Sequence, residues 1–403
     1  MLNSITAVTY ELDDIQAGIS ELANETLRNI KFGRNSFGLL LCDSYSDHKA
    51  LAEGLRQTLG IPIVGFSATA AFSGNGELCD SAAILTVVTS DDVHFSIAVS
   101  EPLTTDNILG QIESTYNKAK AALDGEPALI MAFPPYILGI MIDIYPRELG
   151  RVSGGLPVFG GLPSHDEVYG ESAVYCGDTA ASDRMALLLM SGAVKPVMTV
   201  KNSLGSLTNL KRTVTSSKCN EIYRVGDETF VCFLERFGID VAKFADSDEK
   251  TTFFTSYPLL VEHSGGADMD GIPVVRTLHG VDFETGSGTA IGEVPQGSVI
   301  SVGILQKSDI EMSARNGVKD LLDKMKLNED AGYKYSMVFA VSCVARYYVM
   351  ASDSTLETDV FHKNLPRDIA LSGFYSFGEI CPTSIRDRAS NAAHNESLVM
   401  IAL

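Results

Sequence analysis

Short apolar segments recur along the chain, and each leads into a turn of glycine, aromatic or polar residues. Four of them are followed by a second apolar segment, a pattern typical of strands covered on both faces. The leading segments are IPIVGFS from residue 61, LPVFGGL from 156, IPVVRTL from 272 and IALSGFY from 369, and the returning ones are 82–89, 185–191, 298–305 and 397–403. Three copies also have an apolar strand upstream, at 37–42, 128–133 and 337–343, whereas the copy at 272 is the poorest match. The pattern predicts repeated strand-turn-strand units, in two pairs that divide near 201–209.

Helical periodicity predicts the elements that cover these strands. In the segment 47–59, Leu51, Leu55 and Leu59 fall on one face of a helix. Further helices are expected at 13–28 with Asp13 or Asp14 as the N-cap, at 106–123, at 312–327, and at 136–149, where Pro146 indicates a break near the end.

The connections between strands indicate the kind of sheet. Residues 90–92, Ser-Asp-Asp, separate the apolar segments 82–89 and 93–99 and predict a tight hairpin. Hairpin strands are antiparallel, so a purely parallel doubly wound sheet is not expected. We expect an α/β to α+β fold with mixed or antiparallel sheets, covered by helices and built from the repeated units.

The length of 403 residues exceeds what one ordinary core holds. We therefore expect two strand-rich domains, 1–205 and 206–403, that are separately cored and closely packed. The last strand is apolar on both faces, which is typical of a strand between two layers. Its residues Leu398, Met400 and Ala402 are expected on one side and Val399, Ile401 and Leu403 on the other, all buried.

Composition narrows the class of partner. The net charge of −20 repels phosphate backbones, so nucleic-acid binding is not expected. The seven cysteines form no C-x-x-C pair, which disfavours a disulfide framework or a structural zinc site. The N-terminus lacks the basic and apolar regions of a signal peptide. The most apolar stretch, 128–145, is broken by Pro134, Pro135 and Asp143 and is too short for a membrane span. We expect a cytoplasmic protein.

Polar groups gather near the C-terminus. Tyr375 and Glu379 lie in the segment SGFYSFGEICP, and His394 and Asn395 begin the HNES that follows. These groups could satisfy turn amides, orient a ligand, or act as an acid–base pair of Glu379 and His394. The guanidinium of Arg346 suits a carboxylate, which could belong to a ligand or to a neighbouring glutamate.

Other motifs carry little chemistry. The segment GADMDG lacks the distal glutamate of a calcium loop, and SGTAIGE lacks the lysine of a P-loop. The seven histidines form no i, i+4 pair, so no metal site is expected. No catalytic residue is assigned, and an enzyme is less expected than a binding protein.

The segment GFYSFGEICP followed by HNES resembles the C-terminal signature of the FIST domain. Further segments are similar to that family, namely SCVARYY (342–348), YRVGDETFVCFLERFGID (223–240), GIPVVRTLHGVD (271–282), EVPQGSVISVGI (293–304) and PVFGGLPSHD (157–166). The turn in IPIVGFSATA departs from the family pattern, with Phe66 in place of cysteine and Ala70 in place of glycine. The resemblance covers nearly all of the chain, as a FIST N-terminal and a FIST C-terminal domain.

This resemblance implies a sensory protein. Small ligands such as amino acids have been suggested for the family, and some bacterial members bind haem. Because the two domains use both halves of the chain, we expect a stand-alone sensor that signals through a separate output protein. We expect Arg346, Tyr375, Glu379, His394 and Asn395 to line one pocket for an amino acid or similar small carboxylate. The alternatives are a haem-binding gas sensor, an enzyme that uses Glu379 and His394, or a direct pair of Arg346 with Glu379 that leaves no cavity.

Overall fold

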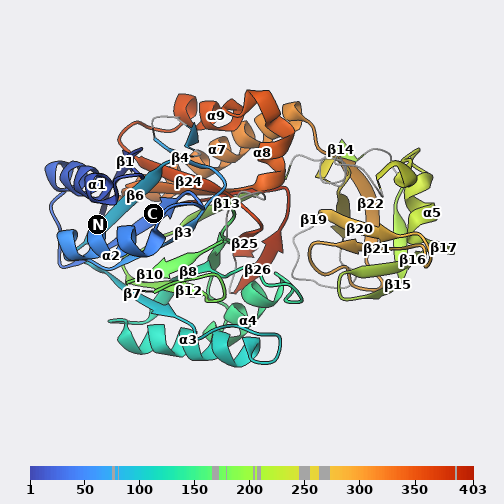
Figure 1. Cartoon of the computed structure of the whole chain (residues 1–403), viewed down its shortest axis with the longest axis horizontal. Coiled ribbons are helices and arrows are strands. Elements are labelled where there is room, and N and C mark those ends of the chain that lie inside the picture. The colour runs from blue at the N-terminus through green and yellow to red at the C-terminus, as the bar shows by residue number, and fades with distance from the viewer. Residues whose placement is uncertain are drawn as a thin grey trace.

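The computed structural model contains three copies of one α/β unit and a separate antiparallel lobe (Figure 1). It describes residues 1–74, 78–79, 81–165, 172–177, 179–202, 205–206, 210–244, 255–262, 273–385 and 388–403. No helix among these residues is long and apolar enough to cross a membrane.

Each unit runs strand, helix, strand, helix, strand and returning strand. Unit 1 comprises β1 (Leu2–Thr9), α1 (Ile15–Asn29), β2 (Asn35–Cys42), α2 (His48–Leu59), β3 (Ile63–Ser67) and β6 (Ala83–Ser90). Unit 2 comprises β7 (Val93–Val99), α3 (Ile108–Ala122), β8 (Pro127–Phe133), α4 (Ile144–Ser153), β9 (Val158–Gly161) and β12 (Ala186–Gly192). Unit 3 comprises β13 (Val197–Lys201), α7 (Lys307–Glu329), β23 (Met337–Cys343), α8 (Val344–Met350), α9 (Leu356–Asn364), β24 (Ala370–Ser376) and β27 (Leu398–Ala402).

The three sheets share one strand order, in which the returning strand is second and the third and fourth strands are parallel to each other. The orders are β1-β6-β2-β3, β7-β12-β8-β9 and β13-β27-β23-β24. Among the strand pairs that the structure describes, only β2–β3, β8–β9 and β23–β24 are parallel. The fold is therefore an α/β mix with mixed sheets, as expected. Figure 1 shows α1 and α2 on the left of the body, α3 and α4 below, and α7 and α9 above.

A hairpin from each unit extends the sheet of another unit. The hairpins are β4 (Ala71–Ser73) with β5 (Leu78–Cys79), β10 (Val174–Cys176) with β11 (Thr179–Ala181), and β25 (Glu379–Ile385) with β26 (Ala389–His394). Strand β4 pairs with β24, β10 with β3 and β25 with β9. Unit 1 thus extends unit 3, unit 2 extends unit 1 and unit 3 extends unit 2, which closes a cycle.

An equivalent glycine in each unit allows the two parallel strands to approach. A Cβ atom on Gly65 would lie 1.9 Å from the main-chain oxygen of Leu40 in the neighbouring strand, and one on Gly160 would lie 1.9 Å from that of Ala132. On Gly373 it would lie 2.4 Å from the oxygen of Ala340. Only glycine fits such contacts, which explains why the sequence repeats carry glycine at these places.

The lobe is inserted between β13 and α7. It contains β14 (Gly205–Ser206), β15 (Arg212–Lys218), β16 (Glu221–Val225), β17 (Glu228–Thr229), α5 (Phe230–Glu235), a 3₁₀ turn (Val241–Phe244), β18 (Leu259–Glu262), β19 (Val274–Arg276), β20 (Leu278–Asp282), β21 (Ser287–Ala290) and β22 (Val299–Ile304). All its described strand pairs are antiparallel. Strands β19 and β20 lie at opposite ends of the strand order yet are joined by Thr277, so the sheet curls back on itself.

The main hydrophobic core is shared by all three units. Phe66 of unit 1 lies with its ring centroid 4.6 Å from that of Phe133 in unit 2 and 4.4 Å from that of Phe374 in unit 3. The same core includes Phe159 and Phe339. The expectation of separately cored halves is therefore wrong, because the units of both halves bury their inner sheet faces against one another. The boundary between 205 and 206 itself stays a prediction.

Several sequence predictions are corrected. The copy at 272 is β19 of the lobe, so three units are present and not two pairs. Strands β6 and β7 form no hairpin, because the chain crosses at Asp91 and Asp92 from the sheet of unit 1 to that of unit 2. Helix α4 begins only at Ile144, and Pro146 occupies its first turn, where a missing N–H costs little.

Other predictions are confirmed. Asp14 caps α1 by accepting from the N–H groups of Gln16 and Ala17. Leu51, Leu55 and Leu59 form the buried face of α2. The last strand, β27, lies between β13 and β23. Its side chains alternate between the shared core (Val399, Ile401 and Leu403) and the layer under α7 (Leu398, Met400 and Ala402).

Candidate functional site

A buried polar cluster lies at the carboxyl end of the parallel pair in unit 3. Cys343 and Ser376 end β23 and β24 in register. Arg346 follows in α8, Tyr375 precedes the end of β24, and Glu379 begins β25. The carboxyl ends of parallel strands meet at one edge of a sheet, where ligands of α/β proteins commonly bind.

Arg346 is fully buried and pairs with Glu357 of α9 at 2.5 Å. Its Nη2 atom also donates to the Ser313 hydroxyl at 2.8 Å, and the Ser342 hydroxyl donates to Glu357 at 2.7 Å. The direct pair of Arg346 with Glu379 that the sequence left open is not formed. The internal partner is a glutamate from another helix.

Five buried side-chain atoms in this part of the chain have no well-directed hydrogen-bond partner, although the Tyr375 hydroxyl lies near the Glu357 carboxylate and Glu379 near the Cys343 thiol. They are Arg346 Nη1, the Tyr375 hydroxyl, Glu379 Oε1, Asn395 Oδ1 and Glu396 Oε2. Leaving one such group unsatisfied costs about 1–3 kcal/mol. Unpaired buried atoms also occur elsewhere in the described part of the chain, at Thr26, Asn35, Thr199, Ser298 and Ser336.

Burial sets the charge state of the cluster. It raises the pKa of Glu379 and of Glu396 well above the usual carboxyl range, while the Arg346 charge acts in the opposite direction on both. Burial, and then the charges of Glu379 and Glu396, also raise the pKa of the Cys343 thiol. Burial, followed by the Glu357 charge, raises that of Tyr375. The protonated forms are favoured, and a protonated carboxyl or phenol donates a hydrogen bond.

His394 is bonded elsewhere. It lies opposite Glu379 in the β25–β26 pair, but its Nε2 atom is 2.9 Å from the Cys381 carbonyl oxygen. Glu379 instead accepts from the Ser397 N–H at 3.2 Å. Burial lowers the pKa of His394 to about 4, so its ring stays neutral at ordinary pH. The structure brings Arg346, Tyr375 and Glu379 together, places Asn395 beside Glu396, and directs the His394 bond outside this group.

Residues of the lobe contact this end of the body. The Thr277 hydroxyl donates to Glu396 at 2.9 Å. The neighbouring Arg276 pairs with Asp143 at 2.5 Å and donates to the Ala393 carbonyl. The carboxylate partner of Arg276 is therefore internal to the chain.

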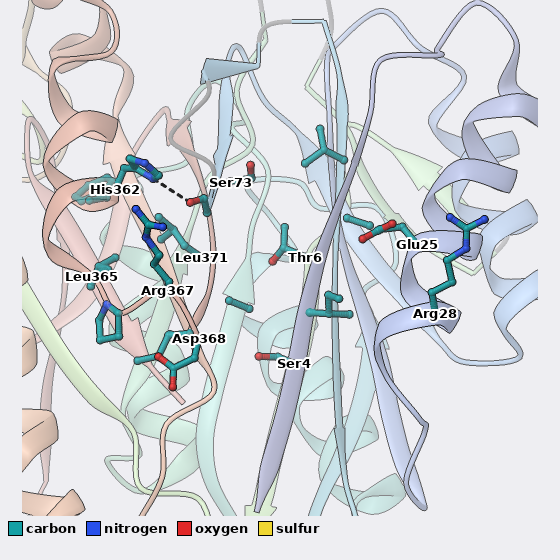
Figure 2. Close-up of a pocket in the computed structure, with 18 of the residues that line it drawn as sticks. Ser4, Thr6, Glu25, Arg28, Ser73, His362, Leu365, Arg367, Asp368 and Leu371 are labelled. Carbon is teal, nitrogen blue, oxygen red and sulfur yellow. Dashed lines mark hydrogen bonds between the residues drawn. The ribbon is translucent and has the colours of Figure 1, made fainter.

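An open groove of about 1000 Å³ lies between units 1 and 3 (Figure 2). Residues Ser4–Val8 of β1 line it between two walls, α1 and the α9–β24 connection. Arg28 and Arg367 lie on opposite walls in Figure 2, and neither forms an ion pair with another described residue. Sequence reasoning missed this groove, because no local pattern shows that α1 and α9 face each other.

Comparisons with known proteins find two family domains in the chain. A model of the FIST N domain matches residues 36–228, and a model of the FIST C domain matches residues 232–382. A crystal structure of cyanuric acid hydrolase from A. caulinodans is similar at 9% sequence identity and a TM-score of 0.31, covering 100% of this chain and 99% of that one. A likeness at this TM-score supports no conclusion about activity. No curated protein matches the chain.

Proposed function

The chain belongs to the FIST family, whose domains are sensory and bind small ligands in signalling, and from this premise we propose that it is a sensor for a small carboxylate such as an amino acid. The observation that supports the proposal is the group of five unpaired polar atoms around Arg346. We propose Arg346, Tyr375, Glu379, His394 and Asn395 as its ligand-binding residues, with Glu396 added.

The donor and acceptor types favour this ligand class. Arg346 and Tyr375 offer donors, and so do Glu379 and Glu396 when protonated. A carboxylate accepts several hydrogen bonds at once. The unpaired Asn395 oxygen accepts, which suits the ammonium or hydroxyl group of the same small molecule. Of the predicted residues, His394 has the weakest support, since its Nε2 bonds to a main-chain carbonyl.

The signal is proposed to pass to a separate protein in the cytoplasm, docked at the groove beside β1. The outer edge of β1 pairs with no strand in the described part of the chain. Edge strands are usually protected by charge, proline or a bulge, whereas β1 has none of these over an unbroken register from Leu2 to Thr9. In a second copy of this chain, β1 would lie between the same two walls and would be poorly placed to pair with this edge. We therefore propose that an extended segment of another protein adds to the edge of β1.

A haem-binding sensor is the second candidate. In the groove, His362 Nδ1 lies 3.3 Å from the Gly74 carbonyl oxygen, which leaves Nε2 for an axial bond. Arg28 and Arg367 offer charges for propionates, and Ile5 and Leu371 add apolar surface. Haem added to the purified protein would give a strong absorption band near the blue edge of the visible spectrum, lost in His362→Ala.

The leading proposal is tested by thermal melting with the twenty amino acids and a set of small dicarboxylates. A ligand at 100 times its Kd adds about 2.7 kcal/mol of stability. We expect one of these two classes of compound to raise the melting temperature of the wild type by several degrees. Arg346→Lys, which keeps the charge but lacks Nη1, should lose this shift, and Glu379→Gln should reduce it.

Glu262→Gln in the lobe, an exposed carboxylate, is the matched control and should keep the full shift. Native mass spectrometry of protein purified from its own host gives a second measurement. A small carboxylate at one copy per chain supports the proposal. The proposal would be overturned if no compound changed the melting temperature and if the protein purified from its own host had the mass of the chain without a ligand.

A further inference from the structure

Unit 1 carries a second buried polar cluster at the place equivalent to the cluster of unit 3. Cys42 ends β2 and pairs in register with Ser67 of β3, as Cys343 pairs with Ser376. Asp43 follows directly, and His48 begins α2. Both clusters therefore lie at the carboxyl end of the parallel pair of their unit.

The three side chains of this cluster offer a sulfur, an oxygen and a nitrogen. The Cys42 sulfur, a carboxylate oxygen of Asp43 and a ring nitrogen of His48 all lie within 4.8 Å of one another. Cys42 is 1% exposed, Asp43 8% and His48 9%. Among the described residues this is the one such group of three.

The surroundings hold each group in place and leave a ligand atom available. Asp43 Oδ1 accepts from the N–H groups of Tyr45 and Ser46 at 3.0 and 2.9 Å, so Oδ2 remains. His48 Nε2 lies 2.6 Å from the Asp43 carbonyl oxygen. Because a carbonyl only accepts, Nε2 donates in this contact, and a neutral ring in this tautomer has its lone pair on Nδ1. Such a bond from the second ring nitrogen is typical of histidines that bind metals.

Packing further fixes the imidazole ring of His48. This ring stacks on the ring of Tyr175, with centroids 5.3 Å apart and 16° between the planes. The Tyr175 hydroxyl donates to the carbonyl oxygens of Leu40 and Phe66, at 3.0 and 2.8 Å. The imidazole therefore rests on a rigid wall.

We propose that Cys42, Asp43 and His48 bind a divalent transition metal ion, with Zn²⁺ the best match. Sulfur and imidazole ligands favour zinc over calcium or magnesium, which take oxygen ligands. Two zinc bonds of about 2.0–2.3 Å at a tetrahedral angle place their ligand atoms about 3.5 Å apart, so the three side chains need to close by about 1 Å. Three protein ligands leave a fourth position for water or a small molecule. The site lies outside the carboxylate cluster of unit 3 and does not depend on it.

Cobalt titration tests this site in the full chain. After chelation with EDTA, Co²⁺ should bind at one equivalent per chain and give a sulfur-to-cobalt absorption band in the near ultraviolet, which Zn²⁺ displaces. Cys42→Ser should lose the band. Asp43→Asn should weaken binding by about tenfold or more. The matched control Cys219→Ser, at an exposed cysteine, should keep the full signal.

X-ray absorption of the zinc-loaded wild type keeps the test independent of variants that fail to fold. We expect one sulfur at about 2.3 Å and the remaining ligands nitrogen or oxygen at about 2.0 Å. A first shell without sulfur, or a cobalt band that persists in Cys42→Ser, would overturn the proposal.

Discussion

Arg346 and Glu357 form an ion pair without solvent exposure. Removing one partner leaves an uncompensated buried charge, whereas replacing both by apolar residues removes the problem. We predict that Arg346→Met lowers the free energy of unfolding by about 3–5 kcal/mol and that the double variant with Glu357→Met recovers most of the loss. Urea unfolding measures both variants. Equal losses in the single and the double variant would show that the pair is not the cause.

His394 makes stability depend on pH. Its pKa is about 4 when folded, against an ordinary 6.5, so the unfolded chain binds a proton in this range that the folded protein does not. Stability is fully present above pH 6.5 and falls as the pH drops toward 4, by about 3 kcal/mol. We predict that His394→Gln flattens this acid side of the stability curve in calorimetry.

The pKa of Glu379 shifts in the opposite direction to that of His394, so this residue serves as the control. Its folded pKa is raised, so its contribution to stability is lost as the pH rises from the ordinary carboxyl range. Its window begins in the same acid range as that of His394 and acts against it, so Glu379→Gln should make the acid loss steeper, whereas His394→Gln makes it flatter. Parallel curves for the wild type and His394→Gln would contradict the assignment.

At the scale of elements, β1 is a regular strand with one unpaired edge. We predict that alternate amides of β1, those pointing away from β6, exchange with deuterium much faster than their neighbours. Residues Gly38–Cys42 of β2, which pair with strands on both sides, are the control and should be protected throughout. Uniform protection of β1 in residue-resolved exchange would mean that this edge is covered.

The last strand is the element on which unit 3 depends. Strand β27 separates the shared core from the layer under α7 and pairs with β13 and β23. Deleting 397–403 removes both sets of contacts and also the Ser397 N–H bonded to Glu379. We predict that this deletion unfolds the body rather than trimming a tail, seen as loss of cooperative melting. Normal melting of the truncated chain would refute it.

At the scale of the whole molecule, few polar contacts join the lobe to the body. Among the described residues they include Thr277 to Glu396, Arg276 to Asp143, and Arg147 to Glu293. We predict that Thr277→Val, which leaves the Glu396 carboxyl without this donor, loosens the lobe. Small-angle scattering should show a larger radius of gyration. Thr285→Val, on an exposed turn of the lobe, is the control, and equal scattering from both variants would count against the contact.

Local chemistry in the sequence determined helices α1, α2, α3 and α7, the strands of the repeats, the double-sided burial of β27 and the family, but not helices α8 and α9. Asp14 and Asp47 cap helices through neighbours two or three residues away, and strand alternation needs only adjacent residues. The sequence also pointed to the region of Arg346, Tyr375 and Glu379, because a shared motif marks it.

Only the tertiary structure decided that there are three units, that hairpins are exchanged between them, and that Glu357 is the partner of Arg346. The Ser164 hydroxyl, for example, donates to the Tyr375 carbonyl across 211 positions of the chain. Only the fold places a ligand atom of each of Cys42, Asp43 and His48 within 4.8 Å of the others. Such contacts depend on how whole sheets pack, since burial is cooperative over residues that no short pattern connects.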